Sequence, residues 1–343
     1  MNTFQCSCGN ALFLDSTQCV QCEKPTTLCP VCQEVTAWEA NGDNLGICGN
    51  IQCQAQLKLC ANYRNFGVCN NSISVDEVEE TLCSHCRLTT VIPDFDVEGN
   101  LEKWSRLEWA KHRVLYAIEK IGLPIGTPEN HWVPKLSFEF KADREKPGKD
   151  KKKAEPIATG HANGCITINL KEADSVKREI ARVEFGEPQR TLVGHFRHEL
   201  GHYYWDLLVN PTRLEKFRKL FGNETSPPYA DAMDAYYENG PLPNWQNSFI
   251  SAYATMHPWE DFAETFAAYL DMVAVLMTSE DFDLTTDANN VIDGNDFDAM
   301  VNEYSRVGIL ANELNREMGL IDLVPEVYSR PVIEKLRFVH ELR

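Results

Sequence analysis

Two histidines and a glutamate fall within five residues near the middle of the chain, in the order His198-Glu199-Leu200-Gly201-His202. Residues four apart on a helix share one face, so both imidazoles can bind one metal ion while Glu199 faces a water molecule beside it. Zinc suits this arrangement because it lowers the pKa of a bound water, whose proton a glutamate can accept. The spacing predicts a catalytic zinc on a helix, with His198 and His202 as ligands and Glu199 as general base.

A third ligand is expected from a second segment, further along the chain. Pro258 suits the first position of a helix, and the apolar residues that follow recur at helical spacing. Glu260 and Glu264 lie one turn apart on the other face. We therefore expect Glu260 to bind zinc and Glu264 to accept a hydrogen bond from a ligand imidazole. The alternative is a solvated acidic stripe on a surface helix.

Twelve of the thirteen cysteines precede residue 87. A gap of two residues lets two thiolates reach one tetrahedral zinc, and a second pair closes the shell. Because a closed shell leaves no position for substrate, these zincs are expected to be structural. In sequence order the cysteines give three sites: Cys6, Cys8, Cys19 and Cys22; Cys29, Cys32, Cys48 and Cys53; Cys60, Cys69, Cys83 and Cys86.

Two alternatives to this grouping stay open. The cysteines at 48, 53, 60 and 69 could pair in an interleaved way, and His85 could replace a cysteine. Scattered buried thiols without metal are a third possibility, but random placement would not gather twelve cysteines in one quarter of the chain. The predicted cofactors are one catalytic zinc and about three structural zincs.

Local sequence patterns predict the elements that position these residues. Residues 1–95 are rich in turns and show little helical periodicity, which is typical of metal-held knuckles. Residues 101–121 have helical spacing and predict a long helix that opens a second domain. Residues 166–170 alternate like a half-buried strand, and helical patterns such as 301–318 dominate afterwards. The predicted fold is α+β, with a zinc-ribbon module over 1–95 and a catalytic domain over 96–343 that ends in helices.

Composition narrows the partners and the location. The 33 Lys and Arg residues against 51 Asp and Glu give a formal charge of −18, which repels nucleic acid. No stretch reaches the roughly 20 apolar residues of a membrane span, and residues 1–6 lack the features of a signal peptide. We therefore expect no membrane partner and a cytoplasmic location, where reduced thiols favour metal binding over disulfides.

Three parts of the chain resemble the bacterial zinc metallopeptidases that carry an N-terminal zinc ribbon: residues 194–206, residues 258–264 and the cysteine-rich start. The Glu-x-x-x-Glu helix is also similar to that of the gluzincins, including the protease domain of anthrax lethal factor. This resemblance implies a zincin-like catalytic domain in which Glu260 binds zinc and Glu264 supports a histidine. It also implies an oxyanion role for Tyr253, which lies seven residues before Glu260.

The predicted strand, with His161 and Asn163 before it, resembles the edge strand that binds extended peptides in zincins. The expected substrate-binding residues are accordingly Ile166, Thr167 and Ile168, although core packing explains the isoleucines equally well.

Together these features predict a zinc-dependent metallopeptidase that hydrolyses a protein or peptide substrate with a zinc-bound water activated by Glu199. Two alternatives remain: a non-enzymatic protein-binding module in which every metal is structural, and a zinc hydrolase that acts on a non-peptide amide. Protein docking is the expected role of the zinc-ribbon module, because its only basic residues are Lys24, Lys58, Arg64 and Arg87.

Overall fold

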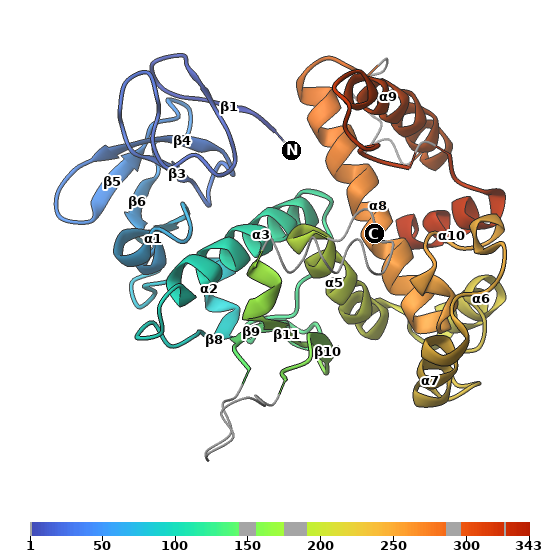
Figure 1. The fold of residues 1–343 in the computed structure, drawn as a ribbon. Coiled ribbons are helices and arrows are strands. Elements are labelled where there is room, and N and C mark those ends of the chain that lie inside the picture. Colours follow the sequence, from blue (N-terminus) through green and yellow to red (C-terminus); the bar gives the residue numbers. More distant parts are fainter. Residues whose placement is uncertain (1, 144–155, 175–190, 286–295, 326) are drawn as a thin grey trace.

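The N-terminal part of the computed structural model consists of short strands and turns that carry the cysteines (Figure 1). The structure describes residues 2–143, 156–174, 191–285, 296–325 and 327–343. A hairpin of β1 (Phe4–Gln5) and β2 (Ala11–Leu12) precedes an antiparallel sheet in the order β3-β4-β5-β6-β7. Its strands are β3 (Thr26–Leu28), β4 (Val35–Ala40), β5 (Leu45–Cys48), β6 (Gln56–Leu59) and β7 (Ser72–Ser74). Of two short helices, α1 (Ala61–Phe66) lies between β6 and β7 in the sequence, and α2 (Ser84–Arg87) follows β7.

A second sheet has the order β10-β11-β9-β8, in which β11 and β8 are parallel to β9 and β10 is antiparallel to β11. Its strands are β8 (Thr89–Val91), β9 (Ser137–Lys141), β10 (Gly160–Ala162) and β11 (Cys165–Asn169). Thus β8 belongs to the second sheet although it precedes residue 95, where the sequence placed the domain boundary.

The expected substrate-binding strand is not an edge strand. Ile166, Thr167 and Ile168 lie on β11, whose backbone pairs with β10 on one side and β9 on the other. Both isoleucines are fully buried. The alternation of residue types revealed one buried face, but it could not show whether the strand was paired along both sides. The expectation that this strand is an edge strand is therefore wrong, and among the described residues the edge strands of this sheet are β10 and β8.

The long helix predicted over 101–121 is confirmed as α3 (Asn100–Lys120), which packs against α5 (Leu192–Leu208), the helix that contains His198 and His202. Two short 3₁₀ segments, η2 (Trp245–Asn247) and η3 (Tyr253–Thr255), lie between the later helices, and a third, η1 (Leu170–Ala173), follows β11. The remaining helices are α6 (Pro211–Phe221), α7 (Tyr229–Asn239), α8 (Pro258–Asp281), α9 (Phe297–Glu317) and α10 (Arg330–His340). The mixed α+β fold predicted from the sequence is confirmed.

Helix α8 forms the centre of the helical part. It is long and apolar enough to cross a membrane by length and composition alone, which corrects the expectation that the chain has no such stretch. However, 61% of its most apolar window is buried inside the protein. Its side chains Phe262, Phe266 and Leu270 are fully buried and belong to the main core, so α8 has the burial of a core helix.

Candidate metal centre

The predicted histidine helix is present as α5, and its start is fixed by Thr191, whose Oγ1 accepts a hydrogen bond from the Gly194 N–H at 2.9 Å. His198 and His202 lie one turn apart on this helix, with their Nε2 atoms 3.2 Å from each other. Both side chains are largely buried, at 16% and 5% exposed. The helix therefore presents two imidazole nitrogens at one point.

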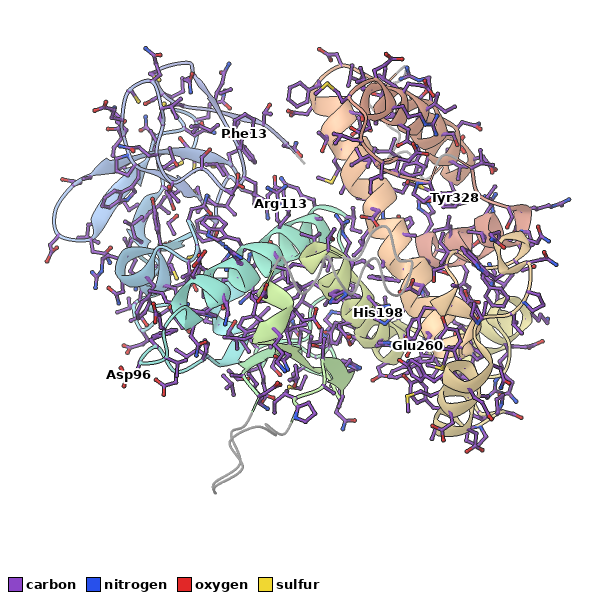
Figure 2. All side chains as sticks on the ribbon, in the orientation of Figure 1. Phe13, Asp96, Arg113, His198, Glu260 and Tyr328 are labelled. Atoms are coloured by element: carbon purple, nitrogen blue, oxygen red, sulfur yellow. The ribbon has the colours of Figure 1, made fainter. Side chains whose placement is uncertain are left out.

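Helix α8 brings Glu260 to the same point (Figure 2). Pro258 occupies the first helical position, and the helix lies close against α5 because Gly201 has no side chain. A Cβ atom at Gly201 would lie only 2.7 Å from the Cα of Ala263. The glycine between the two histidines is thus needed for the approach of the second helix, as well as being part of the motif.

The three ligand atoms form a compact triangle. Glu260 Oε2 lies 3.1 Å from His198 Nε2 and 3.4 Å from His202 Nε2, and the third side is the 3.2 Å between the nitrogens. Ligands about 2.0–2.1 Å from a tetrahedral zinc are separated by about 3.3 Å. Glu260 Oε2 is buried and makes no hydrogen bond among the described residues, which leaves it available to a cation. The residues present therefore fit a zinc ion.

Glu264 lies one turn after Glu260 and contacts the far side of an imidazole. Its Oε1 is 2.6 Å from His198 Nδ1. When the proton is on Nδ1 and is hydrogen-bonded to this carboxylate, Nε2 keeps a free lone pair for a metal. The structure thus places Glu264 where it orients His198 and increases the basicity of the ligand nitrogen.

Tyr229 was missed by the sequence reasoning. Its hydroxyl donates a hydrogen bond to Glu260 Oε1 at 2.8 Å, so the two oxygens of Glu260 have different environments. The contact joins the first residue of α7 to the first turn of α8. No spacing rule could have found it, because it depends on how α7 folds back over α8.

The predicted base and oxyanion residue are both near the triangle. Glu199 is 8% exposed, and its Oε2 has no hydrogen-bond partner among the described residues. Burial raises the pKa of Glu199 although His198 and His202 act to lower it. The ring of Tyr253, on η3, lies 6.1 Å from the ring of His198. Burial and the Glu260 charge raise the pKa of Tyr253, so this phenol stays protonated and can donate a hydrogen bond.

Aromatic side chains enclose His202. The Trp259 ring lies 3.9 Å from the His202 ring, and the His161 ring stacks on it at 6.5 Å. His161 belongs to β10, so the edge of the second sheet reaches the metal centre. By contrast, His195 Nδ1 lies 3.2 Å from Glu172 Oε2, and that nitrogen is therefore engaged in a pair outside the ligand triangle.

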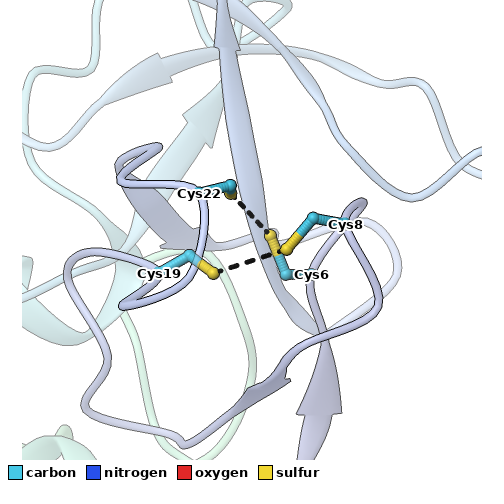
Figure 3. Close-up of side chains that lie close together, drawn as sticks. All are labelled: Cys6, Cys8, Cys19 and Cys22. Atoms are coloured by element: carbon cyan, nitrogen blue, oxygen red, sulfur yellow. Dashed lines mark hydrogen bonds between the residues drawn. The ribbon is translucent and has the colours of Figure 1, made fainter.

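The twelve N-terminal cysteines gather into three groups of four, in sequence order, and the ligand atoms within each group lie within 4.8 Å of one another. In the first group Cys6 and Cys22 have sulfurs 3.6 Å apart, and the sulfurs of Cys8 and Cys19 are 3.7 Å apart (Figure 3). In the second group two sulfur pairs are separated by 3.8 and 3.9 Å. Four thiolates about 2.3 Å from one zinc would be about 3.8 Å apart.

The third group is wholly buried and touches the second domain. Its Cys86 Sγ lies 3.4 Å from His112 Nε2 on α3. His85 is not one of the grouped residues, because its Nε2 faces Glu119 Oε1 at 3.1 Å. The interleaved pairings and a ligand role for His85 are thus not what the structure shows.

Comparison with known proteins agrees with this geometry. Residues 100–342 match the family described as "Putative zinc-binding metallo-peptidase", and residues 3–97 match a zinc-ribbon domain. The chain belongs to this metallo-peptidase family. Proteins of Mycobacterium tuberculosis and Mycobacterium bovis, both described as uncharacterized, are 35% identical to it over 99% of this chain and 94% of their own length. No solved structure matches the chain significantly. The relatives therefore match both parts of this chain, and the site geometry is the basis for assigning roles to its residues.

Proposed function

We propose that this family member is a zinc-dependent peptidase that hydrolyses peptide bonds at the centre between α5 and α8. The observation that carries the proposal is the ligand triangle of His198, His202 and Glu260, with sides of 3.1 to 3.4 Å, next to the buried carboxylate of Glu199. A purely structural metal site would have a closed shell, whereas three protein ligands leave a position for water or substrate.

Each residue at the centre has a chemical role in this proposal. His198, His202 and Glu260 would hold the zinc, which when bound acidifies water and polarises a carbonyl group. Glu199 accepts the proton of the attacking water and returns it to the leaving amine, a task that suits a carboxylate whose pKa is raised by burial. Tyr253 donates a hydrogen bond to the oxygen that gains negative charge in the transition state.

An extended peptide is the favoured substrate because of the position of β10. Among the described residues no strand pairs with the outer side of β10, and this strand packs against α5. Its His161 stacks on His202, so a peptide paired with β10 would pass beside the ligands. This feature favours peptide hydrolysis over the hydrolysis of small amides, and β10 takes the role that the sequence had given to β11.

The three cysteine groups are proposed to bind structural zinc, because four thiolates around one ion leave no open position. The whole chain would then hold about four zinc ions. In the same proposal the zinc-ribbon module supports the catalytic domain and offers a surface for protein docking, without chemistry of its own.

The proposal is tested by Glu199→Gln, which keeps the size of the side chain but cannot accept a proton. The native protein, loaded with zinc, is screened against a peptide library and against small amides. For any peptide that is cleaved, Glu199→Gln should lower turnover by roughly 10²- to 10⁴-fold with unchanged zinc content. Glu215→Gln is the matched control, since Glu215 lies on α6 with its side chain 82% exposed.

Two results would overturn the proposal. Cleavage by Glu199→Gln at the native rate would show that another site is responsible. Hydrolysis of small amides with no cleavage of any peptide would assign the centre to the other class of zinc hydrolase.

A further inference from the structure

A lysine occupies a buried position on the last helix. Lys335 is 5% exposed and shares one face of α10 with Val332 and Val339, which are also buried. An apolar side chain would fill this position without the cost of burying a charge, and replacing a buried ion pair with apolar residues is often neutral or stabilising. Core packing therefore does not explain the charge of Lys335, and its contacts indicate what the charge does.

The ammonium group of Lys335 joins two segments that carry residues of the metal centre. Its Nζ lies 2.6 Å from Asp261 Oδ2, and Asp261 follows Glu260 in the first turn of α8. The same Nζ donates a hydrogen bond to the carbonyl oxygen of Ser248 at 2.8 Å. Ser248 lies five residues before Tyr253 in the sequence. Lys335 thus connects the segment that carries Tyr253 to the turn that carries Glu260.

The segment of residues 245–256 has few other fixed points. It consists of η2, η3 and the irregular chain between them. Among the described residues, its backbone-to-backbone hydrogen bonds join residues at most four apart, so none of them ties it to another element. The Phe249 ring lies 4.2 Å from Lys335 Nζ and adds a second contact with the same ammonium group. The position of Tyr253 beside His198 therefore depends on Lys335 and on the packing of η3 against α8.

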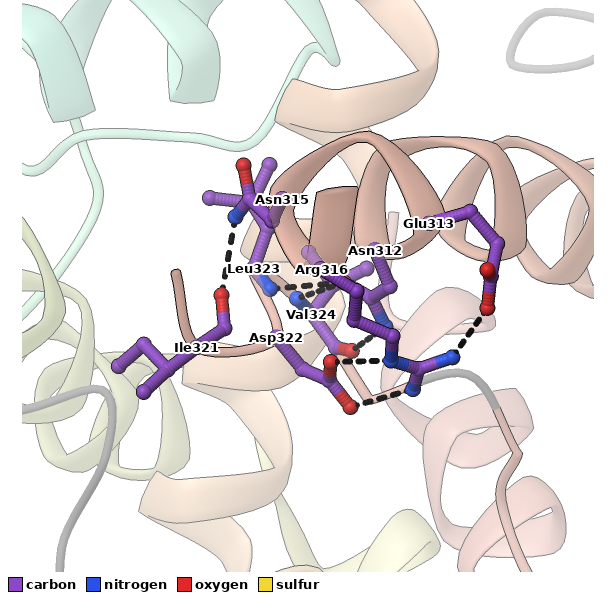
Figure 4. Close-up of polar contacts among 8 residues, drawn as sticks. All are labelled: Asn312, Glu313, Asn315, Arg316, Ile321, Asp322, Leu323 and Val324. Atoms are coloured by element: carbon purple, nitrogen blue, oxygen red, sulfur yellow. Dashed lines mark hydrogen bonds and ion pairs between the residues drawn. The ribbon is translucent and has the colours of Figure 1, made fainter. Parts of the chain in front are cut away.

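Helix α10 is a fixed support for this lysine. It packs against α6 and α8. The chain reaches α10 through a loop that is tied to α9 by polar contacts (Figure 4). There the Asn312 amide donates to the Val324 carbonyl at 2.7 Å and accepts from the Leu323 N–H at 2.7 Å. The ammonium group is thus presented from a rigid element, which is what the precise placement of another residue requires.

We propose that Lys335 is a positioning residue, which holds Tyr253 against the metal centre by joining its segment to the first turn of α8. The inference rests on the proposed peptidase function, in which Tyr253 donates a hydrogen bond to the developing oxyanion. Such a donor must be held at one point, and a misplacement of about 1 Å can cost about 100-fold in turnover. Because Tyr229 holds Glu260 separately, Lys335 should govern turnover more than zinc affinity.

The pair variant Lys335→Met/Asp261→Asn tests this proposal, because it removes both charges and leaves neither of them buried without a partner. In the zinc-loaded full chain, turnover of any peptide that the native protein cleaves should fall roughly 10- to 100-fold. Zinc affinity should change by much less than the ~10- to 100-fold usual when a residue that supports a ligand is lost. Adding Tyr253→Phe should lower turnover little further, since both changes remove the same donor, whereas a purely structural role would give two independent losses that multiply.

A second measurement does not depend on activity. Hydrogen exchange of peptides that cover residues 248–256 should be about tenfold faster or more in the pair variant, because the segment loses its fixed point. Peptides from α5 should exchange as in the native chain. Arg337→Met is the matched control, since Arg337 lies on the same helix and its ion pair with Asp298, at 2.7 Å, is partly exposed. This control should keep native turnover and native exchange.

If the pair variant does not fold, Lys335→Arg replaces it. Its planar head group cannot occupy the same point between Asp261 and the Ser248 carbonyl, so turnover should fall about 3- to 10-fold. Native turnover or unchanged exchange in a folded variant overturns the proposal, and so does a full additional loss from Tyr253→Phe. A fall in zinc affinity as large as the fall in turnover also overturns it. A native chain that cleaves no peptide would instead contradict the proposed function, and the exchange rates would still show whether Lys335 holds the segment.

Discussion

Removing the Glu264 carboxylate should weaken metal binding at the catalytic centre without removing a ligand. Glu264 Oε1 accepts a hydrogen bond from the His198 Nδ1–H, with a short N···O distance of 2.6 Å that is typical of a charge-assisted hydrogen bond. In Glu264→Ala the imidazole loses its orienting acceptor. In Glu264→Gln a neutral acceptor remains, so the effect should be smaller.

The magnitude follows from the strength of that hydrogen bond. Hydrogen bonds to charged groups contribute about 1.5–3 kcal/mol in proteins. Both side chains are partly exposed, His198 by 16% and Glu264 by 25%, so the lower half of that range applies. A loss of about 1.4 kcal/mol corresponds to tenfold in affinity. We expect zinc affinity to fall about 10- to 30-fold in Glu264→Ala, within the ~10- to 100-fold usual for residues that support a ligand, and about 3- to 10-fold in Glu264→Gln, where a neutral acceptor remains.

Competition with a chromophoric chelator, on protein in which the cysteine sites are kept filled, measures this affinity. Asp271→Asn is the control, because Asp271 lies on the same helix but pairs with Arg197. Glu260→Ala should weaken binding more than either Glu264 variant. If Glu264→Ala bound zinc less tightly than Glu260→Ala, the two carboxylates would have exchanged roles and the reasoning from the ligand triangle would be wrong.

Four further predictions concern the rest of the chain. Elemental analysis should find about four zinc ions per chain, and the double variant His198→Ala/His202→Ala should lose about one of them. If this variant lost no zinc, the centre between α5 and α8 would not be a zinc site. Gly201→Ala should destabilise the fold by about 1–3 kcal/mol in chemical unfolding, because the added Cβ meets the Ala263 backbone; an unchanged midpoint would contradict that close approach. Tyr229→Phe should lower zinc affinity by about 3- to 10-fold with little change in melting temperature, since it removes only the hydrogen bond to Glu260. If Tyr253→Phe lowered zinc affinity equally, the effect would come from a general change in the structure of the site and not from this hydrogen bond. Burial lowers the pKa of His340 below its usual 6.5, so its neutral form stabilises the fold above that pH and the contribution is lost as the pH falls below it. His340→Leu should therefore show a shallower drop of melting temperature between about pH 7 and 5 than the native chain; an identical drop would contradict it.

The sequence was sufficient for features that depend on local spacing. The two histidines of α5 and the carboxylates of α8 follow from which residues share a helix face, the closely spaced cysteine pairs follow from tight turns, and periodicity alone indicated α3. The grouping of Cys48, Cys53, Cys60 and Cys69 stayed open in the sequence and is decided by the structure. Such patterns have a direct chemical meaning, because a metal requires several ligand atoms at one point.

Features that depend on packing between elements far apart in the sequence could not be predicted from the sequence. The alternation in residues 166–170 predicted a strand correctly, but its position inside the sheet depends on the pairing with β9 and β10. The contact of Tyr229 with Glu260 and the close approach at Gly201 similarly arise from the way helices fold against each other. Periodicity describes one element at a time, so it cannot identify the neighbours of that element.

The contacts of the third cysteine group indicate why the zinc-ribbon module and the catalytic domain occur on one chain. His112 of α3 faces Cys86 at 3.4 Å, and its neighbour Lys111 forms a fully buried ion pair with Glu108 at 2.6 Å. Glu108 also accepts a hydrogen bond from Thr89 on β8, the strand that follows this cysteine group and joins the second sheet. Four buried thiols without a metal would leave His112 without its thiolate acceptor and weaken this network, since buried polar groups stabilise a fold only when all are satisfied. Because α3 packs directly against α5, a metal bound by the third group would support the helix that carries His198 and His202.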